Sequence, residues 1–114
     1  MELTVYHLKN CDTCKKAIKA LENAGHELTL IDVRADGIPV GELARLEAAV
    51  GYETLMNTRS TTWRSLDDAE KADMTAQKAL ELMGEYPTLI KRPVIDDGTS
   101  TSVGWNKEIA ARYT

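Results

Sequence analysis

The chain opens with an alternating pattern of apolar and polar residues and then changes to a helical one. Residues 3–7 alternate and are rich in strand-forming side chains, which predicts a short strand. Residues 13–24 have apolar side chains at helical spacing and end before Gly25, which predicts an amphipathic helix. Residues 27–33 predict a second strand. A strand-helix-strand opening of this kind usually produces a parallel sheet.

The middle of the chain has helical character. Residues 43–50 form an apolar stripe before Gly51, Asp67 stands in capping-box relation to Glu70, and Thr75 opens a further amphipathic stretch that we expect Gly84 to close. We therefore predict a helical insertion over about residues 40–84, within one α/β folding unit.

Strand patterns return after this insertion. We expect strands at residues 88–91, 94–96 and 99–103, with Asp97-Gly98 as the hairpin turn between the last two. Asn106 is a good N-cap for a final short helix. Neither a repeat nor a linker interrupts residues 1–114, so we expect a single domain.

Composition and charge narrow the classes of function. With 43% hydrophobic residues, 114 residues are enough for one core. The 14 basic and 18 acidic residues give a net charge of -4, which argues against direct nucleic-acid binding. No apolar run approaches the roughly 18 residues of a membrane span, and the N-terminus does not resemble a signal peptide. We expect a cytoplasmic protein without a membrane partner.

Two cysteines carry the clearest chemical signal. Cys11 and Cys14 form a C-x-x-C between the first predicted strand and helix, where the motif is typical of redox chemistry. The positive end of the helix dipole and nearby lysines favour a thiolate at Cys11. Cys14, one turn further on, is either a resolving thiol or a small core residue, because it also belongs to the apolar stripe.

Metal binding is a weak alternative for this pair. A tetrahedral zinc site would need two further ligands, and the two histidines, His7 and His26, stand at no recognised spacing. We expect neither a metal nor a bound cofactor.

Two later segments add a family resemblance to the strand, Tyr6-His7 and Cys11. Residues 55–64, Leu-Met-Asn-Thr-Arg-Ser-Thr-Thr-Trp-Arg, and residues 87–94, Pro-Thr-Leu-Ile-Lys-Arg-Pro-Val, resemble the signatures of the ArsC/Spx family, and the YffB-type proteins above all. The resemblance spans essentially the whole chain. It implies a thioredoxin-like fold with a helical insertion between the second and third strands.

The resemblance also implies roles for individual residues. Cys11 matches the catalytic cysteine of the family's arsenate reductases, and Arg92 matches one arginine of the set that holds the anion. The Arg92-Pro93 bond is implied to be cis, which would place Arg92 beside the thiol. His7 matches a histidine thought to favour the thiolate, although it could equally be an ordinary strand residue. Asn10 and Pro93 are further candidates for contact with the substrate.

The match to arsenate reductases is incomplete at the other arginines. Asn57 occupies the expected column of the middle arginine, with Arg59 and Arg64 nearby, and the C-terminal arginine is replaced around Gly104. Missing bidentate donors weaken oxyanion binding. Arg59 and Arg64 are therefore candidates for anion binding, or else solvated surface residues.

These observations support three hypotheses. The first is a glutathione-dependent thiol reductase in which Cys11 attacks a small anionic thiol adduct. The second is an arsenate reductase coupled to glutathione and glutaredoxin. The third is a Spx-like regulator that binds RNA polymerase and uses Cys11 and Cys14 as a disulfide switch.

Overall fold

The computed structural model describes all 114 residues and divides them into two compact units. The first unit joins residues Met1–Gly37 to Arg92–Thr114, and the second consists of residues Ile38–Lys91. The second unit contains the predicted helical insertion at residues 40–84. The expectation that the chain behaves as one domain stays a prediction.

The first unit is built on a four-stranded mixed sheet with the strand order β2-β1-β3-β4. β1 and β2 run parallel, as the strand-helix-strand pattern predicts, whereas β3 lies antiparallel to both β1 and β4. The prediction of an α/β fold with a helical insertion between the second and third strands is therefore confirmed. The elements of this unit are β1 (Glu2–His7), α1 (Asp12–Asn23), β2 (Glu27–Asp32), β3 (Val94–Asp96), β4 (Thr101–Val103) and α7 (Lys107–Tyr113).

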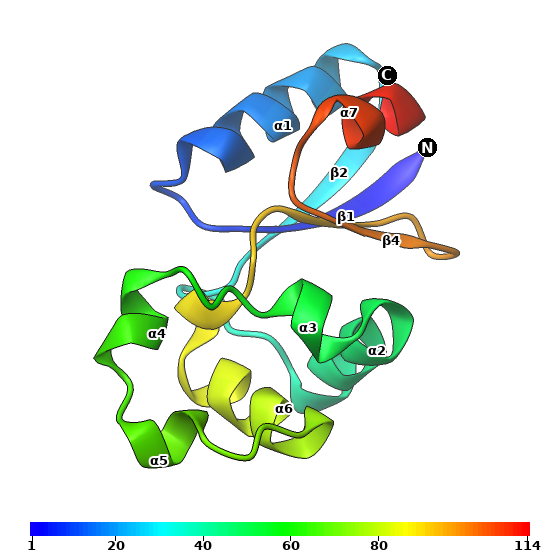
Figure 1. Cartoon of the computed structure of the whole chain (residues 1–114). Helices are drawn as coiled ribbons and strands as arrows, with labels where there is room; N and C mark the ends of the chain where they lie inside the picture. Colours follow the sequence, from blue (N-terminus) through cyan, green and yellow to red (C-terminus); the bar gives the residue numbers. More distant parts are fainter. The chain divides into compact units, whose positions relative to one another are not determined.

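Two helices cover one face of this sheet. α1 and α7 lie side by side over it, with α1 connecting the parallel strands (Figure 1). The buried cluster beneath them draws on β1, β3 and both helices, so it fixes the helices to the sheet through apolar burial. Its members are Leu3, Val5, Leu21, Ile95 and Tyr113.

Polar side chains fix the turns of the same unit. Asp97 accepts hydrogen bonds from the backbone nitrogens of Thr99 (2.8 Å) and Ser100 (2.6 Å) through Oδ1, which closes the predicted β3–β4 hairpin. Gly98 has a φ of 91° in this turn, a conformation that glycine adopts without a steric penalty. Asn106 caps α7 by accepting from the backbone nitrogen of Ile109 at 2.9 Å, as predicted.

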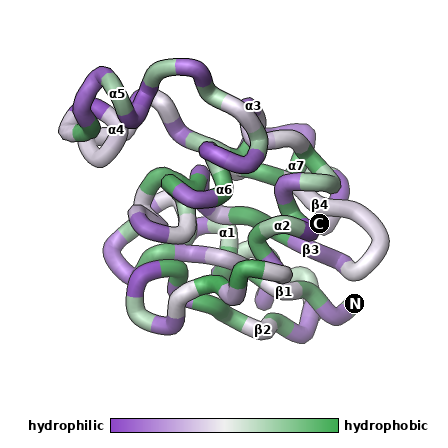
Figure 2. Tube along the Cα trace, turned by 90° about the horizontal axis from the view of Figure 1, so that it is seen from below, coloured by the Kyte–Doolittle hydropathy of each residue, from purple (hydrophilic) through white to green (hydrophobic).

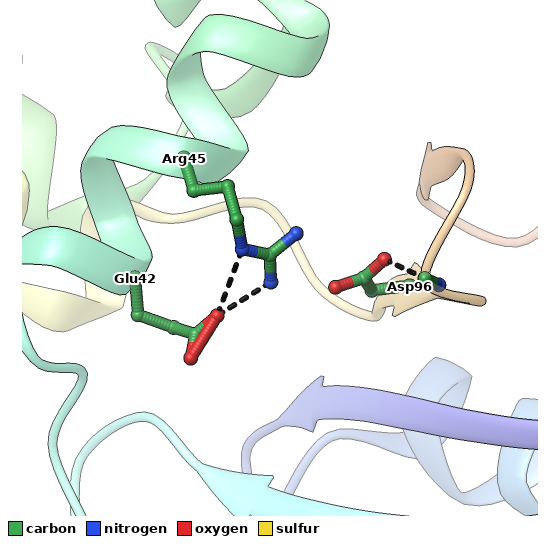
Figure 3. A network of polar contacts seen from close by, with 4 residues as sticks. Glu42, Arg45 and Asp96 are labelled. Carbon is green, nitrogen blue, oxygen red and sulfur yellow. Dashed lines mark hydrogen bonds and ion pairs between the residues drawn. The ribbon is translucent and has the colours of Figure 1, made fainter.

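The second unit consists of short helices. The capping box of Asp67 and Glu70 is present, and Thr75 caps α6, both as predicted. α4 and α5 bury no residue, and the trace along them is coloured mainly purple and white (Figure 2). On α2, Arg45 Nε donates to Glu42 Oε1 at 3.1 Å, an i,i+3 pair on the helix surface (Figure 3). The elements are α2 (Val40–Val50), α3 (Tyr52–Leu55), α4 (Thr61–Ser65), α5 (Asp68–Lys71), α6 (Ala76–Glu85) and η1 (Pro87–Leu89).

The strand predicted at residues 88–91 is wrong. Pro87 fixes its own φ and begins a 3-10 turn, η1, and Ile90 then forms only an isolated bridge with Met56. α6 continues one residue past Gly84, where we expected its end. It stops at Glu85 because Tyr86, the residue before Pro87, avoids helical geometry.

None of the helices in the chain combines the length and the apolarity that crossing a bilayer requires.

Candidate active site

Cys11 lies where β1 passes into α1, and its side chain caps the helix. The backbone nitrogen of Cys11 donates to the carbonyl of Leu8 at 3.1 Å, which closes the turn between strand and helix. The residue then adopts an extended conformation, with φ -100° and ψ 113°, while the backbone nitrogen of Lys15 donates to its carbonyl at 3.0 Å. In this geometry the Cys11 Sγ atom accepts from the backbone nitrogen of Cys14 at 3.4 Å. The sulfur takes the place that a serine or aspartate oxygen usually occupies at an N-cap.

The surroundings of Cys11 favour its thiolate. Partial burial acts to raise the pKa of this thiol, but the hydrogen bonding from Cys14 and the positive charge and hydrogen bonding of Arg92 outweigh burial. The pKa of Cys11 therefore lies below the ordinary value of a free thiol. A thiolate is the nucleophilic form of cysteine, so this arrangement favours attack on a disulfide at neutral pH.

Cys14 has the opposite environment. Its side chain is fully buried, on the same stripe of α1 as Ala17 and Leu21. Burial, followed by the interaction with Cys11, raises the pKa of Cys14 to about 12. Both cysteines are free thiols in the structure. Cys14 thus packs as a core residue while its backbone nitrogen serves Cys11, and its role as a resolving thiol stays a prediction.

Arg92 and Pro93 approach the cysteine from the start of the segment that leads into β3. The Arg92-Pro93 peptide bond is cis, as the family resemblance implies. Pro93 is buried, and its carbonyl accepts from the backbone nitrogen of Gly104 at 2.8 Å. The charge of Arg92 contributes to the lowered pKa of Cys11, so guanidinium and sulfur act within one site.

His7 and Asn10 flank the cysteine along the chain. His7 ends β1 and lies opposite Asp32, the last residue of the parallel strand β2. Asn10 is exposed in the turn that precedes α1. Their predicted contacts with a substrate stay predictions.

Asp32 is a residue that the sequence reasoning missed. Its carboxylate accepts hydrogen bonds from the backbone nitrogens of Lys9 (3.1 Å), Arg34 (2.9 Å) and Ala35 (2.9 Å). These hydrogen bonds, the one from Ala35 above all, hold the pKa of the Asp32 carboxyl below its usual value, with a further contribution from the charge of His7. The available signal was an aspartate at the end of a strand predicted to run parallel to the one that precedes Cys11.

The two remaining candidates, Arg59 and Arg64, belong to the second unit. Both are exposed there. The guanidinium of Arg64 donates to the carbonyl of Arg59 at 3.0 Å, and the backbone nitrogen of Arg59 donates to Asn57 Oδ1 at 3.0 Å. Arg64 thus contacts the backbone of the loop before α4. Anion binding by either arginine stays a prediction.

Comparison with known proteins identifies the family of this chain. The family model of the ArsC family matches residues 6–112. The chain belongs to the ArsC family. The match begins within β1, includes Cys11, Cys14 and Arg92, and ends within α7. Membership in the ArsC family confirms the resemblance read from the motifs.

The similar proteins cover almost the full chain. An uncharacterized protein of Haemophilus influenzae is 44% identical over 112 residues, which are 97% of this chain and 98% of that protein. The solved structure of the YFFB (PA3664) protein is 40% identical, with a TM-score of 0.92 and coverage of 97% of both chains. The global transcriptional regulator Spx of Bacillus subtilis is 26% identical over 115 residues, with coverage of 97% of this chain and 86% of Spx. The ArsC-type thioredoxin-like fold and the likeness to YffB-type and Spx proteins are confirmed.

Proposed function

We propose that this ArsC-family chain is a cytoplasmic thiol-disulfide oxidoreductase that uses glutathione and has Cys11 as its nucleophile. The observation that carries the proposal is the lowered pKa of Cys11, which arises from its hydrogen bonding with Cys14 and from the charge of Arg92. A thiol that has a lowered pKa, is partly exposed and lies at a helix N-terminus has the properties of a reactive cysteine.

The first step is an exchange on a glutathione mixed disulfide. The Cys11 thiolate attacks the glutathione sulfur, a new bond forms between Cys11 and glutathione, and the substrate leaves as its thiolate. The electron pair of the broken S–S bond stays with the leaving sulfur, so the substrate is reduced and Cys11 is oxidised. Arg92 is positioned to attract a carboxylate of the glutathione moiety, because a guanidinium matches a carboxylate in charge and geometry.

The second step regenerates Cys11. A second glutathione thiolate attacks the mixed disulfide, which releases oxidised glutathione and returns the Cys11 thiolate. Cys14 is the competing attacker, but burial raises its pKa to about 12 and keeps it protonated near neutral pH. A glutathione thiol in water has an ordinary thiol pKa and supplies far more thiolate. We therefore assign the second step to glutathione.

Steady-state turnover of a small glutathione mixed disulfide, coupled to glutathione reductase, tests this proposal. We expect turnover by the wild-type protein and none by Cys11→Ser. Trapping with labelled glutathione should also yield a mass shift of one glutathione on the peptide that contains Cys11. Wild-type protein without turnover, or a Cys11→Ser variant that retains it, contradicts the proposal.

A second enzymatic function, arsenate reduction, is favoured by membership in the ArsC family alone. In that reaction Cys11 would attack the oxyanion, with glutathione and glutaredoxin completing the reduction. The chain has Asn57 where the resemblance expects an arginine, which weakens anion binding. The assay coupled to glutathione reductase distinguishes arsenate reduction from thiol reduction, because only an arsenate reductase makes the oxidation of that enzyme's reduced cofactor depend on arsenate.

A regulatory function is favoured by the 26% identity to Spx along 97% of this chain. In this alternative the chain binds RNA polymerase, and a disulfide between Cys11 and Cys14 switches the binding. A pull-down with purified polymerase, run with reduced and oxidised protein, tests it. Binding that depends on the redox state, in a protein without turnover, would favour the regulator over the enzyme.

A further inference from the structure

The carboxylate of Asp32 connects the segments that follow the two parallel strands. We define the nucleophile loop as residues 8–11, between β1 and α1. Oδ2 of Asp32 accepts a hydrogen bond at 3.1 Å from the backbone nitrogen of Lys9, which lies inside this loop. Oδ1 accepts at 2.9 Å from Arg34 and at 2.9 Å from Ala35, in the turn after β2. One side chain thus holds both turns at this edge of the sheet.

We propose that Asp32 is a positioning residue for Cys11, acting through the Lys9 backbone. This inference rests on the proposed function in that it takes Cys11 as the nucleophile. Lys9 lies within the turn that the Cys11 nitrogen closes on the Leu8 carbonyl at 3.1 Å. Fixing Lys9 therefore fixes where α1 begins and keeps the Cys11 sulfur opposite the Cys14 nitrogen.

This connection between the two turns requires a carboxylate, and another polar side chain of the same size would not form it. Both oxygens of Asp32 accept hydrogen bonds, and backbone nitrogens are the donors on both sides. An asparagine has one oxygen, so its amino group would face a backbone N–H either at Lys9 or in the turn after β2. Asp32→Asn therefore breaks this connection with almost no change in volume.

The charge of Asp32 and its positioning role act on the Cys11 pKa in opposite directions. A negative charge near the thiolate disfavours ionisation, so removal of that charge alone would lower the pKa of Cys11. Loss of the loop geometry would weaken the hydrogen bonding between Cys11 and Cys14 and the interaction with Arg92. Because both lower the pKa of Cys11, that pKa would rise. The other charged groups about Asp32 are His7 at the end of β1, the Lys9 side chain, and Arg34 and Asp36 in its own turn, where Asp36 accepts from the Asp32 nitrogen at 2.9 Å.

The test is a pH profile of Cys11 alkylation by iodoacetamide, followed by mass spectrometry on the intact protein. We expect Asp32→Asn and Asp32→Ala to move the profile to higher pH, so that alkylation at pH 6 is at least about threefold slower than in the wild type. The matched control is Asp97→Asn, since Asp97 also accepts two backbone hydrogen bonds in a turn, but within the β3–β4 hairpin. That variant should follow the wild-type profile.

Two outcomes overturn the inference. The first is an unchanged or lowered pKa of Cys11 in a folded Asp32→Asn variant, with folding checked by circular dichroism. The second needs no variant: amide hydrogen exchange at Lys9 in the wild-type protein that is as fast as in an unstructured peptide shows that the bond to Asp32 holds nothing. A wild-type Cys11 that reacts like an ordinary thiol instead contradicts the proposed function, so the two failures are distinguishable.

Discussion

The Sγ atom of Cys11 lies 3.4 Å from the backbone nitrogen of Cys14, which donates a hydrogen bond to it. This contact makes the two thiols unequal. It helps to lower the pKa of Cys11, whereas burial raises the pKa of Cys14 to about 12. One residue therefore contributes a nucleophilic sulfur, and the other contributes a backbone donor and a buried side chain.

Alkylation of Cys11 should reach its maximum rate below the pH at which a free thiol does. Because the pKa of Cys11 is lowered, its thiolate fraction rises at lower pH than that of an unperturbed thiol, whose pKa is about 8.5. Iodoacetamide rates between pH 4 and 9, compared with free glutathione as the control, measure the displacement. Coincident profiles would show that the helix terminus and Arg92 have no effect on this sulfur.

The same pKa difference makes stability depend on pH. A thiol whose pKa is lower in the folded than in the unfolded state contributes stability that is present above the unfolded pKa and lost as pH falls through the folded pKa. Between those two values the free energy of unfolding should rise with pH more in the wild type than in Cys11→Ser. Urea unfolding at several pH values up to 8 measures both slopes, and equal slopes contradict the prediction.

Arg92 should account for part of the thiolate stabilisation. Arg92→Ala removes the positive charge and hydrogen bonding that help to lower the pKa of Cys11, so alkylation near pH 6 should become about three- to tenfold slower. Arg92→Lys retains the positive charge, so its alkylation rate should lie between those of the wild type and Arg92→Ala. Arg112→Ala serves as a control in the same unit, because the Arg112 guanidinium donates to Ser102 Oγ at 2.8 Å instead. A similar loss in Arg112→Ala would mean that net charge, rather than the Arg92 position, sets the rate.

The first unit of the fold could be predicted from sequence because each element there has a strong local pattern. The apolar stripe of α1, the alternation in β1 and the Asp97-Gly98 turn each specify their element without the rest of the chain. Two helices of four and five residues, α3 and α4, are too short to show a period and are not predicted, whereas α5, of four residues, is marked by its capping box. The strand predicted at residues 88–91 is wrong because a short apolar pair, Leu89-Ile90, has the pattern of a strand, and the sequence does not show whether it has a pairing partner.

The residues of the candidate site also differ in how far local sequence patterns reveal them. Cys11 and Arg92 could be recognised because they belong to motifs with fixed neighbours in the sequence. Asp32 could not, since its role depends on the register that sets His7 opposite it and on a contact 23 residues away at Lys9. For Arg59 and Arg64 the sequence shows a charge but not its partner, which for Arg64 is a backbone carbonyl, so anion binding by either residue stays a prediction.

Cys14→Ser should retain turnover if glutathione performs the second step. The buried hydroxyl leaves the backbone nitrogen of residue 14 in place, so the hydrogen bond to Cys11 Sγ persists. We expect the glutathione-coupled rate to stay within about threefold of the wild type, a difference of less than about 0.7 kcal/mol in activation free energy. Iodoacetamide should label Cys14 in the wild type only after denaturation. A complete loss of turnover in a folded Cys14→Ser variant would assign the second step to Cys14.

Leu21 and Leu30 offer a matched test of where the stability of the first unit comes from. Leu21 is 0% exposed in the cluster between α1 and the sheet, whereas Leu30 on β2 is 44% exposed. Leu21→Ala should lower the free energy of unfolding by about 2–5 kcal/mol, because it removes buried methyl groups and leaves a cavity. Leu30→Ala removes the same atoms from a position that is already largely hydrated, so its cost should be below about 1 kcal/mol. Urea unfolding monitored by circular dichroism measures both changes. Equal losses would mean that the first unit does not depend on the α1–sheet cluster, and that the start of α1, where Cys11 lies, is held by other contacts.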